Sequence, residues 1–217
     1  MTLHQSLALK QSVGVSLTKT PKGLSSIKHP ACSAAIWKRE PLPEFQSWIE
    51  RLDPANLPRA RIILRAEMVR NAMTDLSEAY GLPDCDERTM LIDDIAALAA
   101  VFSSIMDSEY LRLRLDVIST NACRKFHVDA LTARLICTYR GHATQYGNGM
   151  MGHDPKDIHD VPTGCPMILR GTNWPSAAKP GLLHRSPPIE GTGETRLVLV
   201  LDPVTDVEAE EDDGHFH

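Results

Sequence analysis

Residues 111–117 read LRLRLDV, an unbroken alternation of apolar and polar side chains. A period of two predicts a half-buried strand, because successive side chains of a strand point to opposite faces. Three further segments on the C-terminal side predict strands, each followed closely by glycine or proline: ARLICTY at 133–139, PMILR at 166–170 and RLVLVL at 196–201. Short strands with such turns and no helix between them are typical of an antiparallel sandwich or barrel.

The region before residue 111 has a different period. Apolar side chains recur at helical spacing, which predicts helices over 44–52, over 59–80 and from Asp84 or Asp86 to about Met106. Residues 31–37 predict a short edge strand closed by prolines. Helices followed by strands indicate an α+β class, in which N-terminal helices buttress a C-terminal β core.

The expected organisation is one α+β domain over 31–204, with helices at about 44–107 and the β core at about 110–203. Residues 1–30 have no sustained period and are expected to form a flexible N-terminal arm. Residues 205–217 are expected to form an acidic, disordered tail.

Composition limits the classes of partner. The chain of 217 residues has a formal net charge of −5 without the clustered basic face of a nucleic-acid binder. The sequence has no run of about 18 apolar residues such as a membrane helix needs. Five cysteines without a C-x-x-C pair favour reduced thiols, so we expect a cytoplasmic protein. We therefore expect a small molecule or another substrate as partner, and neither nucleic acid nor membrane.

The segment FHVDA at 126–130 carries the main chemical signal. In extended chain, His127 and Asp129 point to the same side and can hold one metal ion. His184, from a strand across the barrel, could supply a third ligand. Two imidazoles and one carboxylate leave coordination positions open, as in non-haem Fe(II) oxygenases. The alternative for His-x-Asp alone is a surface or core histidine beside a capping aspartate.

A second signal is Arg196, twelve residues after His184 at the head of an alternating strand. It shares a face with Val198 and Val200, so it points inward if they do. A buried guanidinium requires an anion, and its planar fork suits a carboxylate. That anion could be a dicarboxylate co-substrate bound to the metal, or an internal carboxylate such as Asp116.

The segments FHVDA, ARLICTYRGHATQY, GCPMILRG and LLHRSPPIEGTGETRLVLVLD together resemble the double-stranded β-helix (jelly-roll, cupin-like) barrel of Fe(II)/2-oxoglutarate-dependent dioxygenases, over roughly residues 110–203. The resemblance implies Fe(II) bound by His127, Asp129 and His184, and 2-oxoglutarate bound by Arg196. It places Tyr139 as a hydrogen-bond donor to the co-substrate, although a buried strand aromatic is the alternative. Many such oxygenases have Ser or Thr two residues after the arginine, where this chain has Val198.

The whole chain also resembles an uncharacterised bacterial family, domain of unknown function 1826, through CSAAIWKRE near the N-terminus together with FHVD and LLHRSPP. Genes of that family accompany metal-homeostasis functions. The leading hypothesis is an Fe(II)/2-oxoglutarate-dependent dioxygenase of unknown substrate. The alternatives are a non-catalytic metal-binding protein (Zn(II) or Fe(II)) linked to metal homeostasis, and a cupin-like small-molecule binder.

Three further histidines, His142, His153 and His159, lie among aspartates in the loop-rich region 141–163. They could form a second metal site or shape substrate access. Solvated loop residues are the alternative interpretation.

Overall fold

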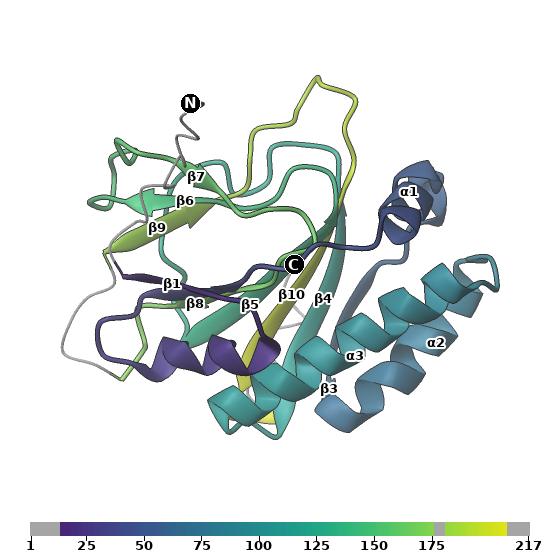
Figure 1. Cartoon of the computed structure of the whole chain (residues 1–217), viewed down its shortest axis with the longest axis horizontal. Coiled ribbons are helices and arrows are strands. Elements are labelled where there is room, and N and C mark those ends of the chain that lie inside the picture. The colour runs from purple at the N-terminus through teal and green to yellow at the C-terminus, as the bar shows by residue number, and fades with distance from the viewer. Residues whose placement is uncertain (1–13, 176–180, 208–217) are drawn as a thin grey trace, which may run out of the picture.

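The computed structural model describes residues 14–175 and 181–207, which form an α+β fold with two sheets packed face to face. The larger sheet within these residues has seven strands, in the order β1 (Val15–Thr18), β2 (Ala34–Trp37), β8 (Met167–Arg170), β5 (Ala133–Arg140), β10 (Arg196–Val204), β4 (Tyr110–Ile118) and β3 (Ala60–Arg65). The smaller sheet has the order β7 (His159–Asp160), β6 (Gln145–Asn148) and β9 (Leu182–Arg185). Figure 1 shows the smaller sheet on one side of the larger sheet, with the long helices on the other.

The helices cover one face of the larger sheet. They are α1 (Pro43–Arg51), α2 (Val69–Ala79) and α3 (Asp86–Met106), with 3-10 turns at η1 (Pro21–Lys28), η2 (Pro54–Asn56) and η3 (Ala66–Met68). Leu197, Leu199 and Leu201 of β10 pack in the core on this helix side. Val198 and Val200 pack in the core between the two sheets. The alternation along one strand therefore serves two separate cores.

The strands predicted from alternating sequence correspond to β4, β5, β8 and β10, and the α+β class is confirmed. The predicted helix over 59–80 is wrong in its first part, because residues 60–65 form strand β3 and the helix α2 begins at Val69. Ile62 and Ile63 fit either structure by spacing. They form a strand because they pair with residues 113 and 112 of β4. Tertiary contacts of this kind override the local preference for a helix or a strand.

The predicted flexible arm is also wrong for the part that the structure describes. Residues 15–18 form β1, parallel to β2, and η1 buries Leu24 and Ile27 completely. Since β1 and β8 flank β2, the predicted edge strand is an inner one. Residues 1–13 of the predicted arm and 208–217 of the predicted tail lie outside the described residues.

Among the described helices, α3 is long and apolar enough to cross a membrane by length and composition alone. Leu91, Ile95 and Phe102 of this helix are buried in the helix-side core. That burial matches the central helix of a folded domain, which passes the same test.

The segment from Asp129 to Thr132 is held in place by residues 171–173. The amide N–H of Gly171 donates to the carbonyl of Thr132 (2.9 Å), and that of Thr172 donates to the carbonyl of Asp129 (2.9 Å). A Cβ added at Gly171 would lie 1.9 Å from the carbonyl oxygen of Leu131. Only glycine permits this close approach, so Gly171 fixes the path of the chain at Asp129.

Gly171→Ala is expected to lower the free energy of unfolding by about 1–3 kcal/mol, because the added methyl group forces the backbone of residues 129–131 to move. Urea denaturation measures the change. Gly181→Ala is the matched control, since an added Cβ there meets nothing within 4 Å. Equal stability of the two variants would contradict the packing role of Gly171.

Candidate metal centre

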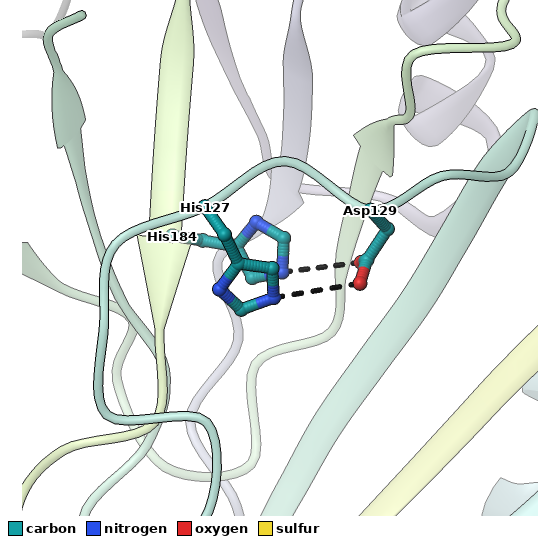
Figure 2. A group of neighbouring side chains, drawn as sticks. All are labelled: His127, Asp129 and His184. Carbon is teal, nitrogen blue, oxygen red and sulfur yellow. Dashed lines mark ion pairs between the residues drawn. The ribbon is translucent and has the colours of Figure 1, made fainter. Parts of the chain in front are cut away.

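His127, Asp129 and His184 meet between the two sheets. His184 lies on β9, and its backbone forms two 3.0 Å hydrogen bonds with the backbone of His127. This antiparallel bridge adds residue 127 to the edge of the smaller sheet beside β9. Asp129 follows two residues later, and Figure 2 shows both imidazole rings directed at its carboxylate.

The distances suit a single metal ion. One ligand atom from each residue can be chosen so that all three lie within 4.8 Å of one another. Nε2 of His127 lies 3.5 Å from Oδ1 of Asp129, and Nε2 of His184 lies 3.2 Å from Oδ2. Nδ1 of His127 lies 2.8 Å from the carbonyl oxygen of Lys125, so as an N–H it donates there. That contact favours the tautomer whose Nε2 is free to bind a metal.

Asp129 is oriented by an arginine that was not predicted from the sequence. Nη1 of Arg134 donates to Oδ1 of Asp129 at 2.6 Å. Nε and Nη2 of the same guanidinium bind both carboxylate oxygens of Asp202 on β10, each at 2.7 Å. Oδ2 of Asp129 is buried and has no hydrogen-bond partner among the described residues. The pair Arg134 and Asp202 thus holds one oxygen of Asp129 and leaves the other available.

The three residues form one electrostatic unit. Burial opposes ionisation of Asp129, but its contacts with His127 and His184 and the charge of Arg134 prevail and hold its pKa well below the ordinary value. The contact with Asp129 raises the pKa of His127. Burial lowers the pKa of His184. With no metal bound, the site therefore favours an ionised Asp129, a neutral His184 and a proton on His127.

Arg196 lies at the start of β10 and points between the sheets, as the alternation predicts. It is 1% exposed, and its Nε donates to the carbonyl oxygen of His142 at 2.6 Å. Its Nη1 is buried and has no hydrogen-bond partner in the part of the chain that the structure describes. Burial lowers the pKa of Arg196 to about 10, with partial compensation from the charge of Glu194.

Asp116 does not form the ion pair with Arg196 that was the alternative interpretation. Asp116 is opposite Val198 in the register, and its ion pair within the described chain is a 4.0 Å contact with Arg114. No described carboxylate lies within ion-pair distance of Arg196. The guanidinium is therefore a buried cation whose anion is missing from the described protein.

The predicted role of Tyr139 is contradicted by its position. Tyr139 lies on the same face of β5 as Leu135 and Cys137, and all three pack in the helix-side core. Its hydroxyl donates to Oδ2 of Asp94 on α3 at 2.7 Å. Tyr139 thus points away from the metal centre and is the buried strand aromatic of the alternative interpretation.

Its neighbour Thr138 occupies the face that was assigned to Tyr139. In the register of β5 and β10, Thr138 is the partner of Val198, so the two side chains point to the same side. The hydroxyl of Thr138 is buried and has no hydrogen-bond partner among the described residues. The resemblance to oxygenases implies a hydroxyl at position 198, where this chain has valine, and Thr138 of the paired strand places a hydroxyl on the same face. Only the cross-strand register, which the sequence does not display, could have identified it.

The other histidines do not join the site. The ring of His142 contacts Glu194 at 2.6 Å, and the ring of His159 stacks on Tyr146. Across residues 14–175 and 181–207, the only cluster of ligand-type side chains with metal-binding spacing is His127, Asp129 and His184. The hypothesis of a second metal site in 141–163 is therefore not supported within the described residues.

Comparison with known proteins gives a family and a fold. The family described as "Protein of unknown function (DUF1826)" matches residues 18–202. No curated protein sequence matches the chain.

Three similar solved structures have low sequence identity to this chain. The dioxygenase for auxin oxidation 1 of Arabidopsis thaliana, in complex with 2-oxoglutarate, has a TM-score of 0.53 at 8% identity and covers 90% of this chain and 94% of its own. The rice dioxygenase for auxin oxidation has a TM-score of 0.48 at 8% identity and covers 90% and 84%. An oxidoreductase of the 2OG-Fe(II) oxygenase family from Burkholderia pseudomallei has a TM-score of 0.39 at 10% identity and covers 82% and 87%. The first of these likenesses establishes a shared jelly-roll fold, and at this identity it establishes the fold alone.

Asp129→Ala and His184→Ala are each expected to weaken metal binding by at least about 100-fold, because each removes one of three ligands. Isothermal titration with Fe(II) under anaerobic conditions, or with Zn(II), measures the affinity. The control is His153→Ala, an exposed histidine in the loop outside the cluster. Binding that survives both ligand variants but is lost in the control would contradict the site.

Metal binding is expected to weaken as the pH falls through the raised pKa of His127, because the proton on that ring must leave before the metal binds. Below that pKa the affinity should fall by about tenfold per pH unit, and the decline should begin above the ordinary histidine value of about 6.5. Titrations across this range with proton-release measurements test the expectation. An affinity that stays constant down to about pH 6 would contradict it.

Proposed function

The chain belongs to DUF1826, a family of proteins of unknown function, and we propose that it is a non-haem Fe(II)- and 2-oxoglutarate-dependent oxygenase. One observation carries the proposal. The cluster His127, Asp129 and His184 occurs together with a buried guanidinium, Arg196, on the face of β10 that packs between the sheets, and no described carboxylate forms an ion pair with that guanidinium. An anion that chelates the metal and also pairs with this buried guanidinium would satisfy both groups.

The donor set fits iron. Two imidazoles and one carboxylate occupy one side of a metal ion and leave the other positions for exogenous ligands. The buried Oδ2 of Asp129, which accepts no hydrogen bond from the described residues, is the kind of atom that a cation satisfies. When bound, Fe(II) and 2-oxoglutarate supply the O2-dependent oxidation chemistry, which belongs to the cofactors rather than to the protein.

Two residues of the larger sheet fit the far end of a dicarboxylate. Arg196 offers a fork of N–H donors that matches a carboxylate, and burial strengthens such a contact. Thr138 offers a hydroxyl on the same face of the neighbouring strand. Each has a buried polar atom without a hydrogen-bond partner in the described part of the chain, so an incoming carboxylate would satisfy two groups at once.

Other groups of the protein orient the metal ligands and exclude water from the site. Arg134 binds Oδ1 of Asp129, on the side of His127, and leaves Oδ2 directed at His184. His184 is buried, whereas the side chain of His127 is 31% exposed, so access to the site is from the side of His127. The substrate is expected to approach from that side, and the apolar core around Val198 and Val200 keeps water from the other.

We further propose that the protein works in the cytoplasm on a small molecule or another substrate, because all five cysteines are free thiols. A non-catalytic zinc protein with the same ligands is the competing function. It would retain Zn(II) tightly and show no turnover.

Anaerobically purified protein loaded with Fe(II) is expected to convert 2-oxoglutarate to succinate when O2 is admitted. Arg196→Gln should raise the KM for 2-oxoglutarate by about 10- to 100-fold, since it removes hydrogen bonds to a charged group. Because no described carboxylate forms an ion pair with Arg196, the same variant should keep its stability to urea or gain some. Absence of turnover together with tight zinc retention would overturn the proposal.

Thr138 allows a sharper control of the same assay. Thr138→Val should raise the KM for 2-oxoglutarate by about 3- to 10-fold. Adding Val198→Thr to that variant moves the hydroxyl across the strand pair, and it should recover most of the loss. Unchanged KM in Thr138→Val would exclude this hydroxyl from co-substrate binding and leave the role of Arg196 intact.

A further inference from the structure

Two arginines of the larger sheet stand directly opposite each other on neighbouring strands. Arg61 of β3 and Arg114 of β4 are direct partners in the antiparallel register, so their side chains project from the same face. Arg114 is also the partner of Val200, which places this face on the side of the smaller sheet and the metal centre. Like charges in directly opposed positions destabilise a sheet unless a counter-charge lies between them.

The described protein provides little counter-charge. The side chain of Arg114 is 23% exposed, and its ion pairs are long, at 3.7 Å to Asp202 and 4.0 Å to Asp116. Both oxygens of Asp202 already accept hydrogen bonds from Arg134. Nε of Arg114 is buried and has no hydrogen-bond partner among the described residues. Burial and the nearby charge of Arg134 lower the pKa of Arg114, as expected where positive charge is in excess.

The side chain of Arg61 is exposed and forms neither an ion pair nor a hydrogen bond with the described residues. Arg65 on the same face of the same strand shows the contrast. Its guanidinium contacts Glu109 at 2.6 Å and the hydroxyl of Tyr110 at 3.2 Å. The shortage of counter-charge on β3 is therefore specific to position 61.

Arg61, one member of the pair, lines a groove along β3 and β4. The groove has a volume of about 470 Å³, and its lining includes Arg61, Asp116 and Ala122. Ala122 belongs to the loop that leads to His127. From the other direction, Arg114 contacts Asp202, Asp202 binds Arg134, and Arg134 binds Asp129. Arg114 thus lies two ion pairs beyond the arginine that orients Asp129, and its cross-strand partner Arg61 lines the groove.

We propose that Arg61 and Arg114 bind an oxyanion, a phosphate or carboxylate group of the substrate, and so hold that substrate at the metal centre. Two guanidinium groups offer paired N–H donors with the geometry that an oxyanion accepts. Asp116 offsets part of the positive charge, so one anionic group matches the groove better than a polyanion does. The role of this group as substrate rests on the proposed oxygenase function, whereas oxyanion binding itself does not.

Oxyanion binding is tested by titrating metal-free protein with inorganic phosphate at low ionic strength in a calorimeter. Saturable binding is expected, weakened about 10-fold or more in Arg61→Gln, because hydrogen bonds to a charged group are lost. Arg65→Gln is the matched control and should bind phosphate as the wild type does. Arg61 is exposed on an edge strand, so its replacement leaves the fold intact, while Arg114→Gln provides a second test if it folds. Absence of saturable binding, or equal weakening in the control, would overturn the inference.

The link to the metal centre needs a separate readout. Mn(II) in place of Fe(II) should broaden the phosphorus resonance of bound phosphate, because a paramagnetic ion relaxes nearby nuclei, and Mg(II) should not. The effect should be lost in Arg61→Gln. Phosphate that binds without broadening would overturn the assignment of this anion to the substrate. Broadening without any 2-oxoglutarate turnover would instead defeat the oxygenase proposal and leave the oxyanion site standing.

Discussion

Burial of β10 on both faces is the constraint on which the rest of the molecule depends. Its leucines fill the core beneath the helices, and its valines fill the core between the sheets. No polar side chain can stand on such a strand without a partner, since burial of an unpaired charge is costly. Its inner face carries two charged residues, Arg196 and Asp202. The buried charge of each therefore requires a group of opposite charge or a hydrogen-bond partner. Arg134 compensates Asp202. For Arg196, the described protein offers the carbonyl of His142 and the more distant charge of Glu194, and the proposed co-substrate would supply the anion in direct contact.

The ion pair between Asp202 and Arg134 explains why the candidate metal centre is ordered. A buried ion pair contributes little to stability compared with an apolar pair of the same size, so its presence is better explained by orientation. Arg134 is fixed at two points by Asp202 and reaches Asp129 with its remaining nitrogen. From the other side, Gly171 lets the chain approach the carbonyls of residues 129 and 131. The carboxylate is thus fixed through both its side chain and its backbone, which is what a preformed ligand set requires.

The sequence predicted those features that depend on local alternation and not those that depend on pairing. β4, β5, β8 and β10 were recognisable because their side chains alternate, and the spacing of His127, Asp129 and His184 indicated the metal cluster. Strand β3 was mistaken for a helix because only its pairing with β4, some 50 residues further on, decides its structure. Tyr139 was assigned to the wrong face for the same reason. Alternation places Thr138 and Tyr139 on opposite faces, but only the register with Val198 shows which face is the interior. Asp202 could have been found, since it lies an even number of residues after Arg196.

The inner face of the larger sheet presents two guanidinium sites in different surroundings, and the difference matters for what each can do. Arg196 is almost fully buried. The low dielectric constant of the interior makes an ion pair there strong and insensitive to salt. Arg61 and Arg114 lie at the rim, where solvent screens the charge and a ligand is held more weakly. A strong, enclosed contact suits a co-substrate that is the same in every cycle. A weaker contact at the rim suits a group that must enter and leave with each substrate. The chain of ion pairs from Arg114 through Asp202 and Arg134 ends at Asp129, whereas Arg196 is not part of that chain.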